Sequence, residues 1–141
     1  MSAANEQIDF SAMPEVRGGV VPYLQVSNAF EASAFYQQAF GAEEAFRVPP
    51  DEQGRTMHIH LYVNGGSLML CDAYPEHGYP LEKPQGFNLN LQVEDIDTWW
   101  TRAIAAGVEV VSPVQETFWG SRYGQVRDRY GVIWAFNQPL T

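Results

Sequence analysis

The feature that most constrains this chain is an internal repeat. The tripeptide Leu24–Val26 recurs letter for letter as Leu91–Val93. Two glycines follow the first copy after 15 and 40 positions and the second copy after 14 and 38 positions: Gly41 and Gly66, then Gly107 and Gly131. A repeat of about 65 residues in two copies is too long and too few for a solenoid. It predicts two copies of one supersecondary module.

The first copy reads as a strand, a helix and three strands. Residues 20–26 favour a strand, and Asn28 and Gly41 are suited to begin and end the helix that follows. Residues 42–48, 57–63 and 67–72 favour three more strands, with a turn at 64–66. In the strand at 57–63, alternation predicts that His58, His60 and Tyr62 share one face.

The second copy gives the same order of elements. Residues 87–93 alternate, so that Asn88, Asn90 and Gln92 share the face opposite the apolar side chains. A helix opens at 94–95 and ends at 107, a strand at 108–111 is closed by Pro113, and a hairpin joins 124–128 to 132–137. We therefore predict an α+β fold in which two tandem βαβββ modules form a curved mixed sheet around a cleft, with the helices outside.

The length and composition fit one domain. We predict an N-terminal tail or packed arm over 1–18 and a single domain over 19–141, with modules at 20–73 and 87–138 and a connection at 74–86. The net charge of −9, with no basic stripe, argues against nucleic-acid and anionic-membrane partners. Cys71 is the only cysteine, and no stretch is apolar enough to span a bilayer, so we expect a cytoplasmic protein.

The paired modules resemble the vicinal oxygen chelate superfamily, which includes glyoxalase I, bleomycin-resistance proteins and extradiol dioxygenases. The resemblance covers 20–138 and is carried by residues of the first helix and the last hairpin: Phe35, Tyr36, Phe40, Gly41, Asp128, Tyr130 and Gly131. The stretch 115–124 is similar to the signature of the small PhnB-like branch. The resemblance implies a cleft formed by eight strands, and members of this family commonly form homodimers, which we expect here.

The resemblance also implies where a metal would bind. Its four ligand positions fall on Val21, Leu70, Asn88 and Ala135, none of which is histidine or glutamate. Three of these side chains offer no lone pair, and an asparagine oxygen alone is a weak ligand for a transition metal. We expect no metal at these positions and no cofactor, with a divalent metal at a non-standard site left open.

His58, His60 and Asp72 are the candidate catalytic residues. Two histidines two positions apart on a strand lie close enough to share a metal, and a carboxylate within reach could act as a base or orient an imidazole. Asp72 would face His58 only if the turn at 64–66 has three residues, whereas a two-residue turn brings Cys71 there instead. Hydrogen-bonding histidines in a polar cleft, or ordinary surface histidines, are the alternatives.

The leading hypothesis is a non-catalytic protein that binds a small organic molecule. The predicted ligand contacts are the polar strand faces and two residues of the 115–124 stretch: Tyr23, Gln25, His58, His60, Tyr62, Asn88, Asn90, Gln92, Trp119 and Arg122. One alternative is a lyase or isomerase that uses the two histidines and Asp72, with or without a metal. Another is a structural or partner-binding protein, in which side chains or the N-terminal arm fill the polar face.

Overall fold

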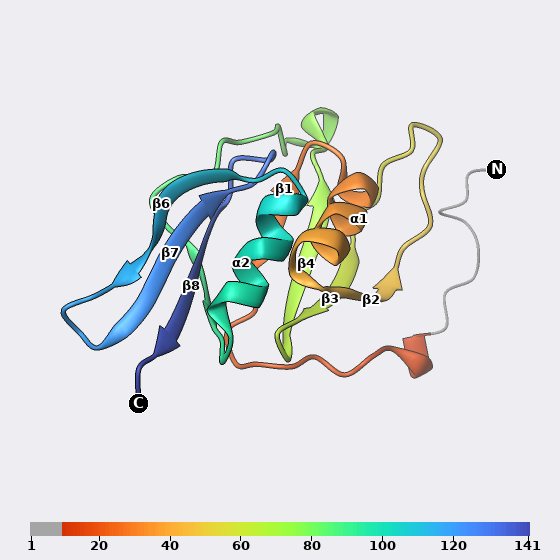
Figure 1. Cartoon of the computed structure of the whole chain (residues 1–141). Helices are drawn as coiled ribbons and strands as arrows, with labels where there is room; N and C mark the ends of the chain where they lie inside the picture. The colour runs from red at the N-terminus through yellow and green to blue at the C-terminus, as the bar shows by residue number, and fades with distance from the viewer. Residues whose placement is uncertain (1–9) are drawn as a thin grey trace. The chain divides into compact units, whose positions relative to one another are not determined.

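The computed structural model describes residues 10–141, which belong to two compact units (Figure 1). The first unit comprises 10–37 and 41–82 of the described residues, and the second comprises 38–40 and 83–141. The boundary at 82 lies inside the predicted connection. No helix within 10–141 is long and apolar enough to cross a membrane.

The first unit holds a four-stranded sheet in the order β1-β4-β3-β2. The β1–β4 pair is parallel and the other pairs are antiparallel. The elements are η2 (Phe10–Ala12), β1 (Tyr23–Val26), α1 (Ala29–Phe40), β2 (Glu43–Arg47), β3 (Ile59–Val63), β4 (Gly66–Asp72) and η3 (Pro75–His77), and the last three residues of α1, 38–40, belong to the second unit.

The predicted ends of α1 are confirmed. The Asn28 side chain accepts a hydrogen bond from the Glu31 N–H at 3.2 Å, and Gly41 adopts a left-handed conformation with φ 65°. The strand before the helix is shorter than predicted. It begins at Tyr23 because Pro22 has no N–H, although the Pro22 carbonyl still accepts from the Met69 N–H at 2.9 Å.

One face of the first sheet carries α1. The Ser33 hydroxyl on the helix donates to the Glu44 carboxylate of β2 at 2.7 Å, and Asp72 at the end of β4 accepts from the Ala29 N–H at 3.0 Å. Apolar side chains of the same sheet face are buried: Leu24, Val26, Ile59, Leu61, Leu68 and Leu70. The opposite face, called the open face below, carries the polar residues of these strands.

The second unit repeats this arrangement with the order β5-β8-β7-β6. Its first strand is again parallel to the last, and α2 lies on the face that buries Trp134 and Phe136. The elements are β5 (Leu89–Gln92), α2 (Ile96–Ala105), β6 (Glu109–Glu116), β7 (Ser121–Arg127) and β8 (Ile133–Pro139). The predicted pair of βαβββ modules is confirmed.

The prediction that Pro113 closes its strand is wrong. β6 continues through Pro113 to Glu116. It is an edge strand whose pairing with β7 shifts register on both sides of Ser112, so a residue without an N–H costs no ladder hydrogen bond there. As a result, most of the 115–124 stretch is strand, and only Thr117–Gly120 forms the turn between β6 and β7.

Candidate functional site

The open face of the first sheet carries the predicted polar row. His60 pairs with Met69 and Tyr62 pairs with Ser67 across β3 and β4, so these side chains share the face away from α1. Tyr23 joins them from β1, where it pairs with Met69. The sequence predicted this shared face correctly.

One half of the open face is closed by residues 15–17. The Tyr62 hydroxyl donates to the Glu15 carbonyl at 2.6 Å, and the Arg17 guanidinium lies 3.8 Å from the centre of the Tyr62 ring. The Arg17 carbonyl accepts from the Ser67 N–H at 2.9 Å. Residues 15–17 of the N-terminal arm therefore pack on this half of the open face. The hypothesis of a structural or partner-binding protein included such a contact. Residues 1–9 lie outside the described part of the chain.

His60 is buried beneath this arm. Its Nε2 lies 2.7 Å from the Ser67 hydroxyl, which accepts from the Arg17 N–H at 2.8 Å and so has its own proton to donate to the imidazole. Burial, followed by the nearby Arg17 charge, lowers the pKa of His60. A neutral imidazole with 1% exposure is a structural group in this conformation.

Of the two histidines on this face, His58 is the one whose ring keeps a nitrogen lone pair for a ligand. The Tyr23 hydroxyl donates to the Met57 carbonyl at 2.7 Å and lies 2.9 Å from His58 Nδ1. With the Tyr23 proton directed to Met57, Nδ1–H of His58 completes the second hydrogen bond, and Nε2 keeps its lone pair. Burial, followed by electrostatic coupling to the neighbouring His60, lowers the pKa of His58, and burial raises the pKa of Tyr23 to about 12. Both groups are neutral near pH 7.

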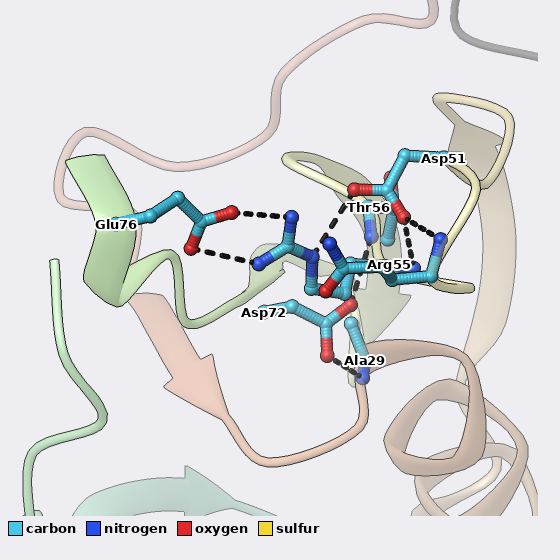
Figure 2. Close-up of polar contacts among 7 residues, drawn as sticks. Ala29, Asp51, Arg55, Thr56, Asp72 and Glu76 are labelled. Carbon is cyan, nitrogen blue, oxygen red and sulfur yellow. Dashed lines mark hydrogen bonds and ion pairs between the residues drawn. The ribbon is translucent and has the colours of Figure 1, made fainter. Parts of the chain in front are cut away.

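Asp72 does not partner His58. The turn has two residues, Asn64 and Gly65, with φ 49° and 82°, and this register brings Cys71 to the open face and turns Asp72 toward α1. The Asp72 carboxylate accepts from the Ala29 N–H at 3.0 Å and from the Thr56 N–H at 2.8 Å (Figure 2). The predicted catalytic role for Asp72 beside the histidines is therefore not supported by its position.

A segment of the predicted connection covers the other half of the open face. The Gln25 amide donates to the Pro80 carbonyl at 3.0 Å and accepts from the Glu82 N–H at 2.8 Å. At the other end of the segment, the Arg55 guanidinium donates to both Glu76 oxygens at 3.0 and 2.6 Å and to Asp51 at 3.1 Å (Figure 2). We call residues 74–82 the covering segment.

Between this segment and the sheet lies a pocket of about 270 Å³. It is lined by residues of both: Gln25, Met57, Cys71, Asp72, Tyr74 and Tyr79. Sequence reasoning found only Gln25 as a ligand contact. Met57 lies before β3 begins, where the alternation of the strand does not indicate which face a side chain takes. The two tyrosines come from a proline-rich stretch whose path no periodicity could indicate.

The open face of the second sheet carries a row of amides. Gln92 donates to Asn90 at 2.6 Å and accepts from Asn137 at 2.9 Å, and the Trp119 indole N–H lies 3.4 Å from the Asn137 oxygen. This row includes three predicted ligand contacts, Asn90, Gln92 and Trp119. Asn137 connects them, and sequence reasoning did not identify it. The pairing of Gln92 with Asn137 could have been found by extending the repeat, since Cys71 stands opposite Gln25 in the first unit. Asn88 is exposed just before β5.

Arg122 lies apart from this row. It pairs with Gln138 across β7 and β8, on the face that carries α2, and its guanidinium donates to Asp97 at 3.0 and 2.9 Å. The structure therefore does not place Arg122 beside Trp119 as a cation for a ligand. Trp119 itself is 52% exposed at the turn before β7.

The positions that the family resemblance assigns to metal ligands do not fit a metal. Leu70 and Ala135 are fully buried and have no donor atom, and Val21 has none either. Within residues 10–141, no three His, Cys, Asp or Glu side chains gather closely enough to hold one ion. His58 and His60 alone supply two donors, and the Nε2 of His60 is already bonded to Ser67.

Comparisons with known proteins find one family model and several similar proteins. The sequence profile of the Glyoxalase/Bleomycin resistance protein/Dioxygenase superfamily matches residues 18–136. The Mycobacterium tuberculosis protein Rv0887c is 37% identical over 145 residues, which cover 98% of this chain and 84% of that protein. Protein PA1353 from Pseudomonas aeruginosa has 32% identity and a TM-score of 0.68, covering 85% of this chain and 96% of that one. A PhnB protein from Bacillus cereus has the same fold, with 24% identity, a TM-score of 0.67, and coverage of 86% and 99%.

Proposed function

Since this chain belongs to the Glyoxalase/Bleomycin resistance protein/Dioxygenase superfamily, we propose that it binds a small organic molecule without a metal centre. The proposed site is the pocket between the open face of the first sheet and the covering segment. The observation that carries the proposal is this pocket of about 270 Å³, lined by Met57, Tyr74 and Tyr79 among others. Its size lies near the lower end of small-molecule sites, so it suits a ligand of one or two rings.

The structure around the pocket supports binding over turnover. Of the three candidate catalytic residues, Asp72 holds two backbone amides and His60 is bonded to Ser67. Only His58 keeps a nitrogen lone pair, and its partner Tyr23 remains protonated near pH 7. A metal-free acid and base pair made of these two groups is the second candidate function.

Methionine methyl groups provide a direct test of the proposal. The chain has four methionines, and Met57 lies in the pocket wall. We expect that small aromatic compounds added to [methyl-¹³C]methionine-labelled protein will shift the Met57 signal, assigned with Met57→Leu, more than that of Met13. Failure of a broad fragment set to move the Met57 signal in folded protein would overturn the proposal.

Paired variants sharpen this experiment. Tyr79→Ala removes a ring from the pocket wall and should weaken fragment binding about threefold to tenfold. Phe118→Ala removes a 97% exposed ring from the turn before β7 and should leave the affinity unchanged. His58→Ala separates the two functions: a binding protein keeps measurable affinity, whereas the acid and base mechanism would lose all turnover of any substrate found.

A further inference from the structure

The pocket wall offers flat rings and soft sulfur atoms. Tyr74 and Tyr79 contribute rings from the covering segment, and Met57 and Cys71 contribute sulfur atoms from the sheet side. Sulfur and aromatic groups both pack favourably against an aromatic ligand. The Gln25 amide already bonds to the Pro80 carbonyl and the Glu82 N–H. The lining therefore favours a ring system over a strongly hydrogen-bonding sugar or peptide.

The charges at this end of the unit are mostly negative. Asp72 is one of the residues that line the pocket, although its carboxylate oxygens accept from the Ala29 and Thr56 N–H groups on the side of α1. Arg55 lies 4.3 Å from the centre of the Tyr74 ring, but all three of its guanidinium nitrogens donate to the carboxylates of Asp51 and Glu76. Two carboxylates thus pair with this one cation, and Asp72 adds a third carboxylate without a cationic partner among the pocket residues. Among the described residues no lysine or arginine lines the pocket.

The titrating groups of the wall add no positive charge. Burial, and then the Asp72 charge, raise the pKa of the Cys71 thiol. Burial raises the pKa of the Tyr74 phenol as well, followed by the Asp51 charge. Both groups stay neutral near pH 7, and in each case a neighbouring carboxylate opposes the formation of a second negative charge. An anionic ligand would meet the same opposition.

We propose that this pocket selects aromatic ligands that are uncharged or cationic and discriminates against the same rings when they carry a carboxylate, sulfonate or phosphate. The inference rests on the proposed function, because it names the ligand class of the same pocket. The whole chain, with a net charge of −9, reinforces the preference at low ionic strength.

Three indole compounds test the selection. Tryptamine, tryptophol and indole-3-acetate share one ring and differ in a short side chain that ends in an ammonium, a hydroxyl or a carboxylate. We expect the first two to shift the Met57 methyl signal in a saturable titration. The dissociation constant of indole-3-acetate should be at least about tenfold higher than that of tryptamine in low-salt buffer.

A charge variant outside the wall shows whether the carboxylates cause the difference. Glu76→Gln removes one negative charge and keeps an amide oxygen to accept from Arg55, so the covering segment stays in place. We expect this variant to lower the ratio of the dissociation constant of indole-3-acetate to that of tryptamine severalfold. Glu109→Gln changes an exposed residue that pairs with Arg127 in the second unit, and it should leave this ratio unchanged.

The outcomes separate this inference from the proposed function. Equal or tighter binding of indole-3-acetate at the Met57 site would overturn the charge selection and leave the binding function standing. A ratio that Glu76→Gln does not change would also contradict the electrostatic cause. If neither these compounds nor the broader fragment set moved the Met57 signal, the binding function itself would fail, and the selection with it.

Discussion

At the scale of single residues, Asp72 is a buried carboxylate with a structural role. Its two oxygens hold the Ala29 and Thr56 N–H groups, and its side chain is 5% exposed. Asp72→Ala leaves both amides without that acceptor, so we expect a loss of about 2–4 kcal/mol in the free energy of unfolding. Urea denaturation of the purified variant measures the loss.

A matched pair of variants checks this explanation. Asp97→Ala removes an exposed carboxylate that pairs with Arg122 and should barely move the denaturation midpoint. Asp72→Asn keeps one acceptor oxygen and should lie between Asp72→Ala and the natural protein. A stable Asp72→Ala protein would show that the two hydrogen bonds contribute little.

The lowered pKa of His60 makes the stability of the fold depend on pH. Its pKa is lowered in the folded state, so the unfolded chain binds its proton at a higher pH than the folded chain does. The contribution of His60 to the free energy of unfolding is fully present above its unfolded pKa of about 6.5. It is lost as the pH falls through the lower pKa of the folded state. His58 acts in the same direction. Urea midpoints measured from pH 7.5 to 5 should therefore decrease.

A glutamine variant isolates this contribution. In His60→Gln the amide oxygen can accept from Ser67 but does not titrate, so the slope between pH 6.5 and 5 should become shallower. The pKa values of Glu44 and Asp51 are also lowered, but such carboxylates change stability only below their unfolded values near 4, outside this window. An unchanged slope in His60→Gln would mean that the buried imidazole does not carry the effect.

At the scale of secondary-structure elements, Gly124 determines how closely β7 approaches α2. A Cβ atom at this position would lie 2.7 Å from Trp100 Cζ3 and 3.0 Å from Val114 Cγ2. Gly124→Ala therefore forces the tryptophan ring to move, and we expect a loss of about 1–3 kcal/mol together with a changed near-ultraviolet circular dichroism spectrum.

Gly66 is the control for this substitution. It lies in β4, and the nearest atom to its added Cβ is the Val63 carbonyl oxygen at 3.8 Å. Gly66→Ala should retain the spectrum and most of the stability. Equal destabilisation by both variants would point to backbone flexibility rather than to the contact with Trp100.

Most elements could be predicted from the sequence because their signals are local. The Asn28 cap, the Gly41 terminus and the alternation from His58 to Tyr62 each report on a few neighbouring residues, and the structure bears them out. The pocket could not be predicted in this way. Its tyrosines are positioned by the long-range hydrogen bonds of Gln25 and Arg55 to the covering segment, which leave no periodic signal.

At the scale of the whole molecule, the repeat extends to how each helix is held. The last strand of each unit supplies a side-chain oxygen to the first N–H of its helix: Asp72 accepts from Ala29 at 3.0 Å and Gln138 accepts from Ile96 at 2.8 Å. The two modules therefore share a cap that differs in charge. The first module uses the carboxylate of Asp72 where the second uses the amide of Gln138, and both accept from the first N–H of the helix. The two modules thus keep the same hydrogen bond with side chains of different charge.

The same divergence at the family's ligand positions leads to a prediction about metals. Val21, Leu70 and Ala135 supply no donor atom, and Asn88 is exposed. Protein purified without chelator should contain much less than one divalent ion per chain by elemental analysis, because residues 10–141 form no group of three His, Cys, Asp or Glu side chains that could retain one. Added Mn²⁺, Ni²⁺ or Zn²⁺ should leave the Tm unchanged, whereas a ligand at about a hundred times its Kd would stabilise the fold by about 2.7 kcal/mol. One tightly held ion per chain, released by chelator with a fall in Tm, would contradict the prediction and reopen a metal-dependent mechanism at His58.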